Sequence, residues 1–299
     1  MAKIIPFSTV ITALLDEKTP FPAKYLGQFS DIQPDHLRSL NSIWSHVNPS
    51  RKIDLLEDLV NLTEKDTLLS FDNLAVSLLN DADSEVRSLA IRLLWESEDS
   101  SLIPVFLKIL KSDTSITPSA AAATALGLFI YMGELEKIPA STLTNLEEEL
   151  IKAARKARDP LIRRRALESL GFSSRWEVHE LIMTALYDPS PDWILSAMIA
   201  IGRSNDQDWE KEVIANLLHG NDEIRIEAIQ AAGQLELEKA RPLLLAQLNE
   251  EDDPEIWHAL LWSLSQIGGE GVSEELEEFI LRIDDPDEED FLDEALENL

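Results

Sequence analysis

The 299-residue sequence contains no cysteine, which excludes disulfides, thiolate nucleophiles and cysteine metal sites. It also lacks the phosphate-binding motif GxxxxGK[ST], the dinucleotide motif GxGxxG and the zinc motif HExxH. The stretch Gly171-Phe-Ser-Ser-Arg lacks the closing glycine of a GxSxG nucleophile elbow. We therefore expect no cofactor, no metal and no catalytic activity.

Basic residues are scarce, with 26 Lys and Arg against 56 Asp and Glu, for a net charge of −30. Proteins bind nucleic acid mainly by neutralising its phosphates, so a nucleic-acid partner is not expected. The charge favours a protein or peptide partner, and a basic one in particular.

Long apolar runs are also missing. The longest spans residues 120–132 and falls short of the roughly 20 residues that cross a bilayer, so we predict a buried helix and no membrane contact. The first residues lack the pattern of a secretory signal, and the expected location is the cytoplasm.

The sequence does contain a repeat. Residues that commonly begin helices recur at spacings of 32, 44, 31, 31, 32 and 32, because their side chains accept hydrogen bonds from free helix amides. These cap positions are Asp83, Ser115, Asp159, Ser190, Asn221, Asp253 and Asp285. Apolar residues three, eight and eleven positions after each cap predict a buried helix face. Each unit therefore reads as helix, turn, helix.

A glycine follows twelve residues after four of the caps. The positions are Gly127, Gly171, Gly202 and Gly233. Since glycine readily adopts the left-handed conformation that ends helices, we expect each second helix to stop there. The spacing of 44 predicts a lengthened helix and a longer loop around Pro139.

The stretches DSEVRSLAIRLL, DPLIRRRALESLG and NDEIRIEAIQAAG resemble HEAT repeats, especially the short bacterial type found in phycobilin lyase subunits. The resemblance implies an all-α fold, a right-handed α-α superhelix of about seven helical pairs. We expect an N-terminal capping segment over residues 1–33 and a solenoid over 34–299. The solenoid would include an insertion at about 128–143 and an acidic capping repeat at 270–299.

The resemblance also implies that the second helices line the concave side of the solenoid. Positions five and nine after the caps point away from the core face, and several are apolar or aromatic: Leu195, Ile199, Ile226, His258 and Trp262. One hypothesis is a groove that takes a peptide or helix, because exposed apolar patches mark partner sites. The alternative is that repeat curvature buries these residues.

Two sets of charged residues complete the predicted sites. A basic island in an acidic chain is predicted to bind a partner or the acidic C-terminal end: Arg155, Arg158, Arg164 and Arg165. An arginine four residues after a cap is predicted to form a structural ladder between turns, in three pairs: Asp83 with Arg87, Asp159 with Arg163, and Asn221 with Arg225.

The predicted function is a non-catalytic scaffold or adaptor for protein–protein interaction, because solenoids offer extended concave surfaces. The alternative is a lyase-like or enzyme-associated factor that handles a cofactor-bearing protein. We expect a monomer, or weak self-association through the basic and acidic patches.

Overall fold

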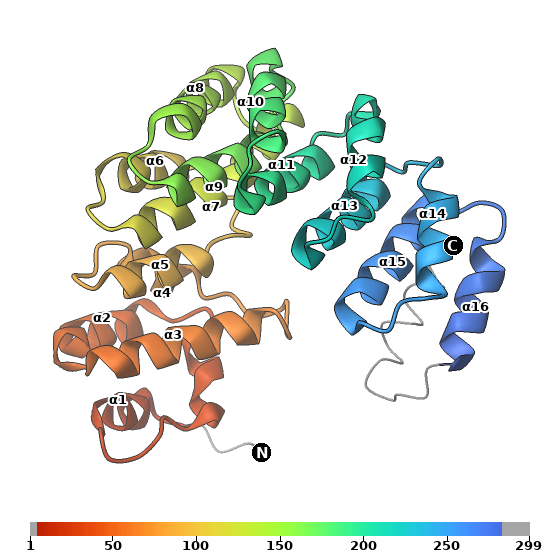
Figure 1. Cartoon of the computed structure of the whole chain (residues 1–299). Helices are drawn as coiled ribbons and strands as arrows, with labels where there is room; N and C mark the ends of the chain where they lie inside the picture. The colour runs from red at the N-terminus through yellow and green to blue at the C-terminus, as the bar shows by residue number, and fades with distance from the viewer. Residues whose placement is uncertain (1–4, 283–299) are drawn as a thin grey trace. The chain divides into compact units, whose positions relative to one another are not determined.

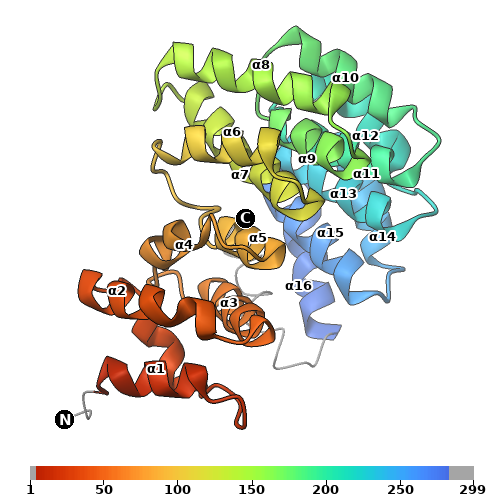
Figure 2. The same cartoon turned by 90° about the vertical axis from the view of Figure 1, so that its left-hand side faces the viewer.

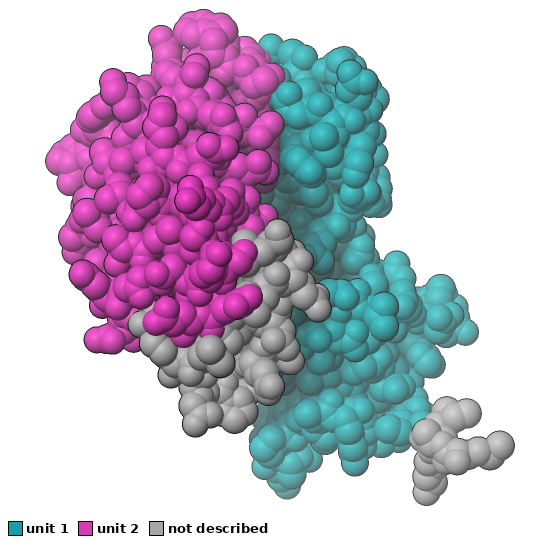
Figure 3. Space-filling model, turned by 90° about the vertical axis from the view of Figure 1, so that its right-hand side faces the viewer, with its two compact units in different colours: residues 1–149, 157–165 teal, residues 150–156, 166–299 magenta. Residues whose placement is uncertain are grey.

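The computed structural model describes residues 5–282, which form helices and no β-strand (Figure 1). The all-α prediction is therefore confirmed. The chain divides into two compact units (Figure 3). Unit 1 comprises residues 1–149 and 157–165, and unit 2 comprises residues 150–156 and 166–299.

Unit 1 stacks helical pairs, as Figure 2 shows. Helices α3, α5 and α7 pack side by side as one layer, while α2, α4 and α6 form the other. Their bounds are α1 Phe7–Leu15, α2 Pro34–Ile43, α3 Pro49–Thr63, α4 Asp72–Leu78, α5 Ser84–Arg92, α6 Leu102–Ser112 and α7 Ile116–Glu134, with 3-10 helices at Ala23–Phe29 and Trp44–His46.

The N-terminal segment packs on the first helical pair through aromatic contacts. The ring of Phe7 on α1 stacks on His36 of α2, with centroids 4.4 Å apart, and meets Phe29 edge-on at 6.1 Å. Phe7 and Phe29 are buried. These contacts cover the outer end of unit 1, although residues 1–4 lie outside the described part of the chain.

The long apolar helix is α7. By length and composition alone it could cross a membrane, yet 67% of its most apolar stretch is buried inside the protein. Its buried side chains include Leu126, Phe129 and Ile130. The prediction of a buried helix over residues 120–132 is confirmed.

The division between the units passes through α8 (Ala140–Lys156) and α9 (Pro160–Leu170). In the 44-residue spacing, α7 continues to Glu134, a short connection contains Pro139, and α8 begins at Ala140. The extra residues therefore extend both helices and leave only a short connection between them.

Unit 2 repeats the two-layer arrangement. Helices α11, α13 and α15 pack side by side, and α10, α12, α14 and α16 cover one side of them. Their bounds are α10 Trp176–Leu186, α11 Pro191–Arg203, α12 Glu210–Asn216, α13 Asp222–Gln234, α14 Arg241–Leu248, α15 Pro254–Ile267 and α16 Val272–Arg282, with a 3-10 helix at Gln207–Trp209.

The predicted caps stand immediately before the second helix of each described pair. Side chains of Asp83, Asp159, Asn221 and Asp253 accept a backbone N–H of the first turn at 2.8–3.0 Å. Ser115 and Ser190 occupy the same position without a side-chain cap bond. The seventh, Asp285, lies outside the described residues.

The prediction for the repeat glycines is wrong in its mechanism. Gly127, Gly202 and Gly233 lie inside their helices, and the repeat glycines do not have positive φ. The left-handed residues after α11 and α13 are Asn205 (φ 50°) and Glu236 (φ 50°). The helices thus continue past the glycine, and asparagine or glutamate adopts the conformation that ends them.

The repeat glycines permit close helix packing instead. A Cβ atom at Gly171 would lie 2.6 Å from the carbonyl oxygen of Ala200. A Cβ atom at Gly233 would lie 2.7 Å from the Cα of Ser263 and 2.8 Å from the ring of Trp262. Real Cβ contacts are longer, so only glycine lets neighbouring second helices approach this closely.

We predict that Gly233→Ala destabilises the protein. In an open helix interior the change would gain about 1 kcal/mol of helix propensity. Here the new methyl group meets the α15 backbone, and overpacking of this kind costs about 1–3 kcal/mol. Urea denaturation would measure the loss. The matched control is Gly220→Ala, because that Cβ meets nothing within 4 Å; equal stability of the two variants would contradict the packing role.

Candidate protein-binding surface

Charged side chains link consecutive turns, and each link joins two repeats. Arg87 donates two hydrogen bonds to the Asp113 carboxylate, from Nε at 2.8 Å and Nη2 at 2.7 Å. Its Nη1 donates to the carbonyl of Asp81 at 2.8 Å. The sequence paired Arg87 with its own cap, Asp83, but that carboxylate binds the Glu85 amide. The acid that receives Arg87 lies two residues before the next cap, Ser115.

The same register recurs at two other places. Lys52 lies four residues after Asn48, the cap of α3, and donates to Asp81 at 3.2 Å. Arg225 lies four residues after Asn221 and approaches Glu251 at 3.7 Å. We call these contacts the turn ladder: Lys52–Asp81, Arg87–Asp113 and Arg225–Glu251.

The acids of the turn ladder also bind their own turns. Asp113 accepts the Ser115 amide at 2.8 Å, and Glu251 accepts the Asp253 amide at 3.0 Å. The hydrogen bonds from Arg87 lower the pKa of Asp113, although partial burial opposes ionisation. Sequence reasoning missed these acids, but their recurrence two residues before the caps was visible in the sequence.

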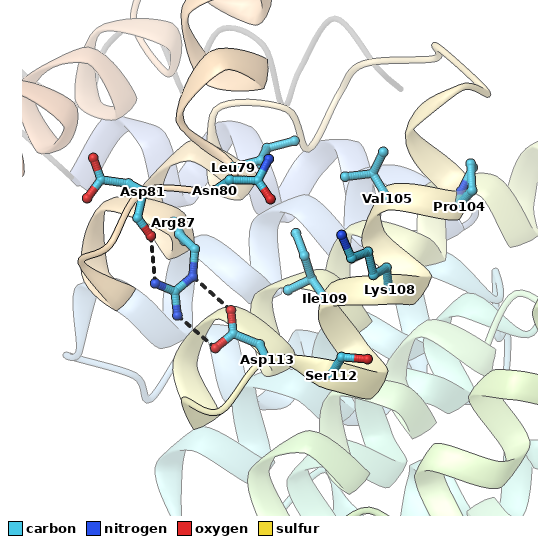
Figure 4. A pocket seen from close by; sticks show the side chains of 10 residues that line it. All are labelled: Leu79, Asn80, Asp81, Arg87, Pro104, Val105, Lys108, Ile109, Ser112 and Asp113. Carbon is cyan, nitrogen blue, oxygen red and sulfur yellow. Dashed lines mark hydrogen bonds and ion pairs between the residues drawn. The ribbon is translucent and has the colours of Figure 1, made fainter. Parts of the chain in front are cut away.

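A groove of ≈ 510 Å³ lies beside the Arg87–Asp113 contact (Figure 4). Its apolar wall comes from Leu79, Val105 and Ile109. Arg87 already binds both aspartates that line it, as the dashed lines of Figure 4 show. We therefore assign the ladder residues a structural role.

The predicted groove residues lie on unit 2, on the side of α11, α13 and α15 away from the outer helices. We call this side the second-helix face. All five residues are half-buried, so they are neither closed core nor fully solvated: Leu195, Ile199, Ile226, His258 and Trp262. Complete burial by repeat curvature, the alternative from sequence, does not occur.

A pocket of ≈ 370 Å³ opens on the second-helix face between α13 and α15. It brings together His258 and Trp262 with Gln230, which the register places beside them. It also contains Gln234, Glu255 and Ala259, which sequence reasoning missed. Leu195, Ile199 and Ile226 are not among the residues that line this pocket.

The aromatic wall of the pocket is held in place by the close packing of α13 and α15. Because Gly233 has no side chain, the ring of Trp262 rests against the α13 backbone. Ser263, the next residue, is buried and donates to the carbonyl of Ile229 at 2.7 Å. The pocket is thus largely formed before any partner binds.

A polar cluster lies beside the pocket on the same unit. Ser196 donates to the carboxylate of buried Glu168 at 2.7 Å, and Arg203 donates to the Glu168 carbonyl at 3.0 Å. The guanidinium of Arg203 also lies over the ring of Phe172, 5.2 Å from its centroid. Burial raises the pKa of Glu227, and the charge of Glu168 adds to the increase while Arg203 opposes it.

The predicted basic island is not uniformly available. Arg158 is exposed, yet its Nη2 donates to the carbonyl of Asp113 at 2.9 Å. Arg164 and Arg165 are half-buried on α9 and have contacts within the chain. Arg155 is exposed at the end of α8, and its charge helps to lower the pKa of Glu177, mainly through the Arg175 hydrogen bond that Glu177 also accepts. Most of the acidic end, residues 283–299, lies outside the described residues.

The described part of the chain shows no arrangement of catalytic or metal-binding groups. Residues 5–282 contain no cluster of three His, Asp or Glu residues that could hold a metal ion. His179 stacks on Trp209 at 4.3 Å, and His258 lies beside Trp257 at 4.0 Å, so these imidazoles make aromatic contacts.

Comparison with known proteins identifies the repeat. A family model for HEAT repeats matches residues 210–299, which include α12 to α16. This chain is a HEAT-repeat protein. A comparison with curated protein sequences returns no match.

Solved structures support the fold of this HEAT-repeat protein. The complex of CpcE and CpcF of phycocyanin lyase from Nostoc sp. is 17% identical, with a TM-score of 0.51, covering 76% of this chain and 94% of that chain. YibA of E. coli is 16% identical, with a TM-score of 0.48, covering 95% and 98%. Importin beta is 12% identical, with a TM-score of 0.47, covering 98% and 46%.

We predict that Asp113→Asn destabilises the protein by about 3 kcal/mol at pH 7. Arg87 and Asp113 have side chains only 13% and 8% exposed, and loss of one partner leaves a charge without its counter-ion in a largely buried position. Urea denaturation would measure the change. The control is Asp99→Asn, since the exposed Asp99 carboxylate binds only Ser101 in its own loop.

The pH dependence gives a second test of the same contact. The folded-state pKa of Asp113 lies below its ordinary value of 3.8. Its contribution is therefore complete above pH 3.8 and disappears as the pH falls through the lowered pKa. The stability difference between wild type and Asp113→Asn should shrink on acidification, and a constant difference down to pH 2 would contradict the ionic role.

Proposed function

We propose that this HEAT-repeat protein is a non-catalytic scaffold or adaptor that binds another protein through the second-helix face of unit 2. The observation that carries the proposal is the pocket between α13 and α15, where Trp262 and His258 line an open hollow instead of closing it. Tryptophan is enriched among residues that dominate binding energy, and preformed concave pockets favour such anchors.

The surrounding surface supports a protein partner over a small molecule. The half-buried Leu195, Ile199 and Ile226 extend apolar area from the pocket toward α11. A peptide or helix that crosses successive second helices would contact this area and the pocket together, which is how a solenoid face distributes binding over several repeats. The absence of cysteine and the resemblance to bacterial repeats place this proposal in a bacterial cytoplasm.

The alternative function is a factor that handles a cofactor-bearing protein, as a subunit of a lyase would. The likeness to the phycocyanin lyase complex shows a shared fold, and function is decided by the site. The pocket offers two glutamines, a glutamate, a histidine and a tryptophan, a set suited to binding a side chain. Co-purification of a coloured small molecule with the native protein would favour the alternative.

We predict that His258→Ala with Trp262→Ala abolishes partner binding and leaves the fold intact. Loss of a tryptophan anchor costs about 2 kcal/mol or more, which is about a thirtyfold loss of affinity. The full chain and the variant would serve as baits in a lysate of the source organism, and the affinity of the recovered partner would then be measured by calorimetry.

The matched control is Trp176→Ala, because Trp176 is 69% exposed on α10 of the same unit and lies in the outer layer. It should bind the partner with unchanged affinity. Thermal unfolding of each variant accompanies the binding measurement. A large loss of thermal stability in the double variant, or a partner that binds it as tightly as wild type, would contradict the proposed surface.

A further inference from the structure

Glu227 is the acid on the second-helix face that the fold does not explain. It lies in the middle of α13, half-buried, and within residues 5–282 no donor hydrogen bonds to its carboxylate. Burial raises its pKa, which means that the surroundings disfavour the charged form. A half-buried carboxylate without a donor is costly to keep in a protein interior.

Neighbouring acids have an ordinary structural role that Glu227 lacks. Glu223 and Glu255 lie in the first turns of α13 and α15, where negative side chains favour the helix dipole. Glu227 lies more than one turn further along α13, beyond the reach of that effect. Its nearest cation, Arg203, already donates to the Glu168 carbonyl and lies over Phe172.

The register of α13 places Glu227 next to the pocket. Residues three and seven positions apart share one helix face, so Glu227, Gln230 and Gln234 form a row along α13. Gln230 and Gln234 line the pocket, and across from them α15 contributes Glu255 and Trp262. Glu227 therefore stands one turn from the pocket, on the side toward α11.

We propose that the pocket and Glu227 together recognise an arginine side chain of the protein partner. This inference rests on the proposed function of the second-helix face. Trp262 supplies a flat aromatic surface for the guanidinium, Gln230 and Gln234 supply amide oxygens as acceptors, and the carboxylates of Glu227 and Glu255 supply the negative charge.

Charge complementarity selects a cation. Neither lysine nor arginine lines the pocket, and its ionisable residues are Glu255 and His258. The chain as a whole carries −30, so a basic segment is also attracted from a distance.

The shape of the site selects arginine over lysine. The planar guanidinium stacks on an aromatic ring and offers five donors in a fixed fork, and it loses less hydration than an ammonium group. A row of three acceptors on α13 with an aromatic wall on α15 matches a planar group with several donors better than a single point charge.

The experiment uses the full chain and three synthetic peptides, acetyl-AAXAA-amide with X as Arg, Lys or Glu. Binding is followed by the indole N–H signal of Trp262 in ¹⁵N spectra, assigned with Trp262→Phe. We expect the Arg peptide to shift this signal with at least a threefold higher affinity than the Lys peptide. We expect no shift from the Glu peptide.

The decisive variant is Glu227→Gln, which keeps the size of the side chain and removes its charge. It should weaken the Arg peptide at least fivefold. The control is Glu180→Gln on the outer helix α10, which removes one exposed charge from the same unit and should leave the affinity unchanged. Equal weakening in both variants would reduce the effect to net charge and overturn the inference.

The outcomes separate this inference from the proposed function. If the Glu peptide shifts Trp262 more than the Arg peptide does, the arginine site is wrong, while the surface still binds peptide. If none of the peptides shifts Trp262, the arginine site is wrong. If, in addition, the natural partner binds the His258→Ala, Trp262→Ala variant as tightly as wild type, the proposed function is wrong as well.

Discussion

Lys52, Arg87 and Arg225 each reach from a helix start to an acid in the next turn, and this reach fixes the spacing between consecutive helical pairs. In a solenoid each repeat contacts only its neighbours, so stability depends on the terms that link one repeat to the next. The ladder acid also accepts the amide of its own turn, as Asp113 does from Ser115. One carboxylate thereby shapes its turn and holds the preceding repeat.

Close packing of the second helices supplies the other link between repeats. Gly171 and Gly233 allow backbones to approach where any side chain would collide. The same approach sets the ring of Trp262 against α13 and opens the pocket beside it. Where the ladder cation is replaced by Trp257, an aromatic contact with Phe279 of α16 takes over, with centroids 5.6 Å apart. The scaffold and the candidate site therefore use the same repeat positions.

The repeat rules also explain which surface is available for binding. Positions that face the neighbouring repeat are filled by small residues, apolar residues or the turn ladder. Positions five, six and nine after the caps face away from the core and are free to vary, from Leu195 and Ser196 on α11 to His258 and Trp262 on α15. A partner would read this variation, because the repeat itself is nearly constant from one unit to the next.

The sequence by itself determined the helical pairs, the caps and the buried helix over residues 120–132, because hydrophobic period and capping chemistry act over a few residues. It also placed His258 and Trp262 on a free face. It could not name Asp113 as the partner of Arg87, since that pairing depends on how one turn stacks on the next. The role of Gly233 and the half-burial of Glu227 were likewise decided by tertiary structure, because both follow from the distance between α13 and its neighbours.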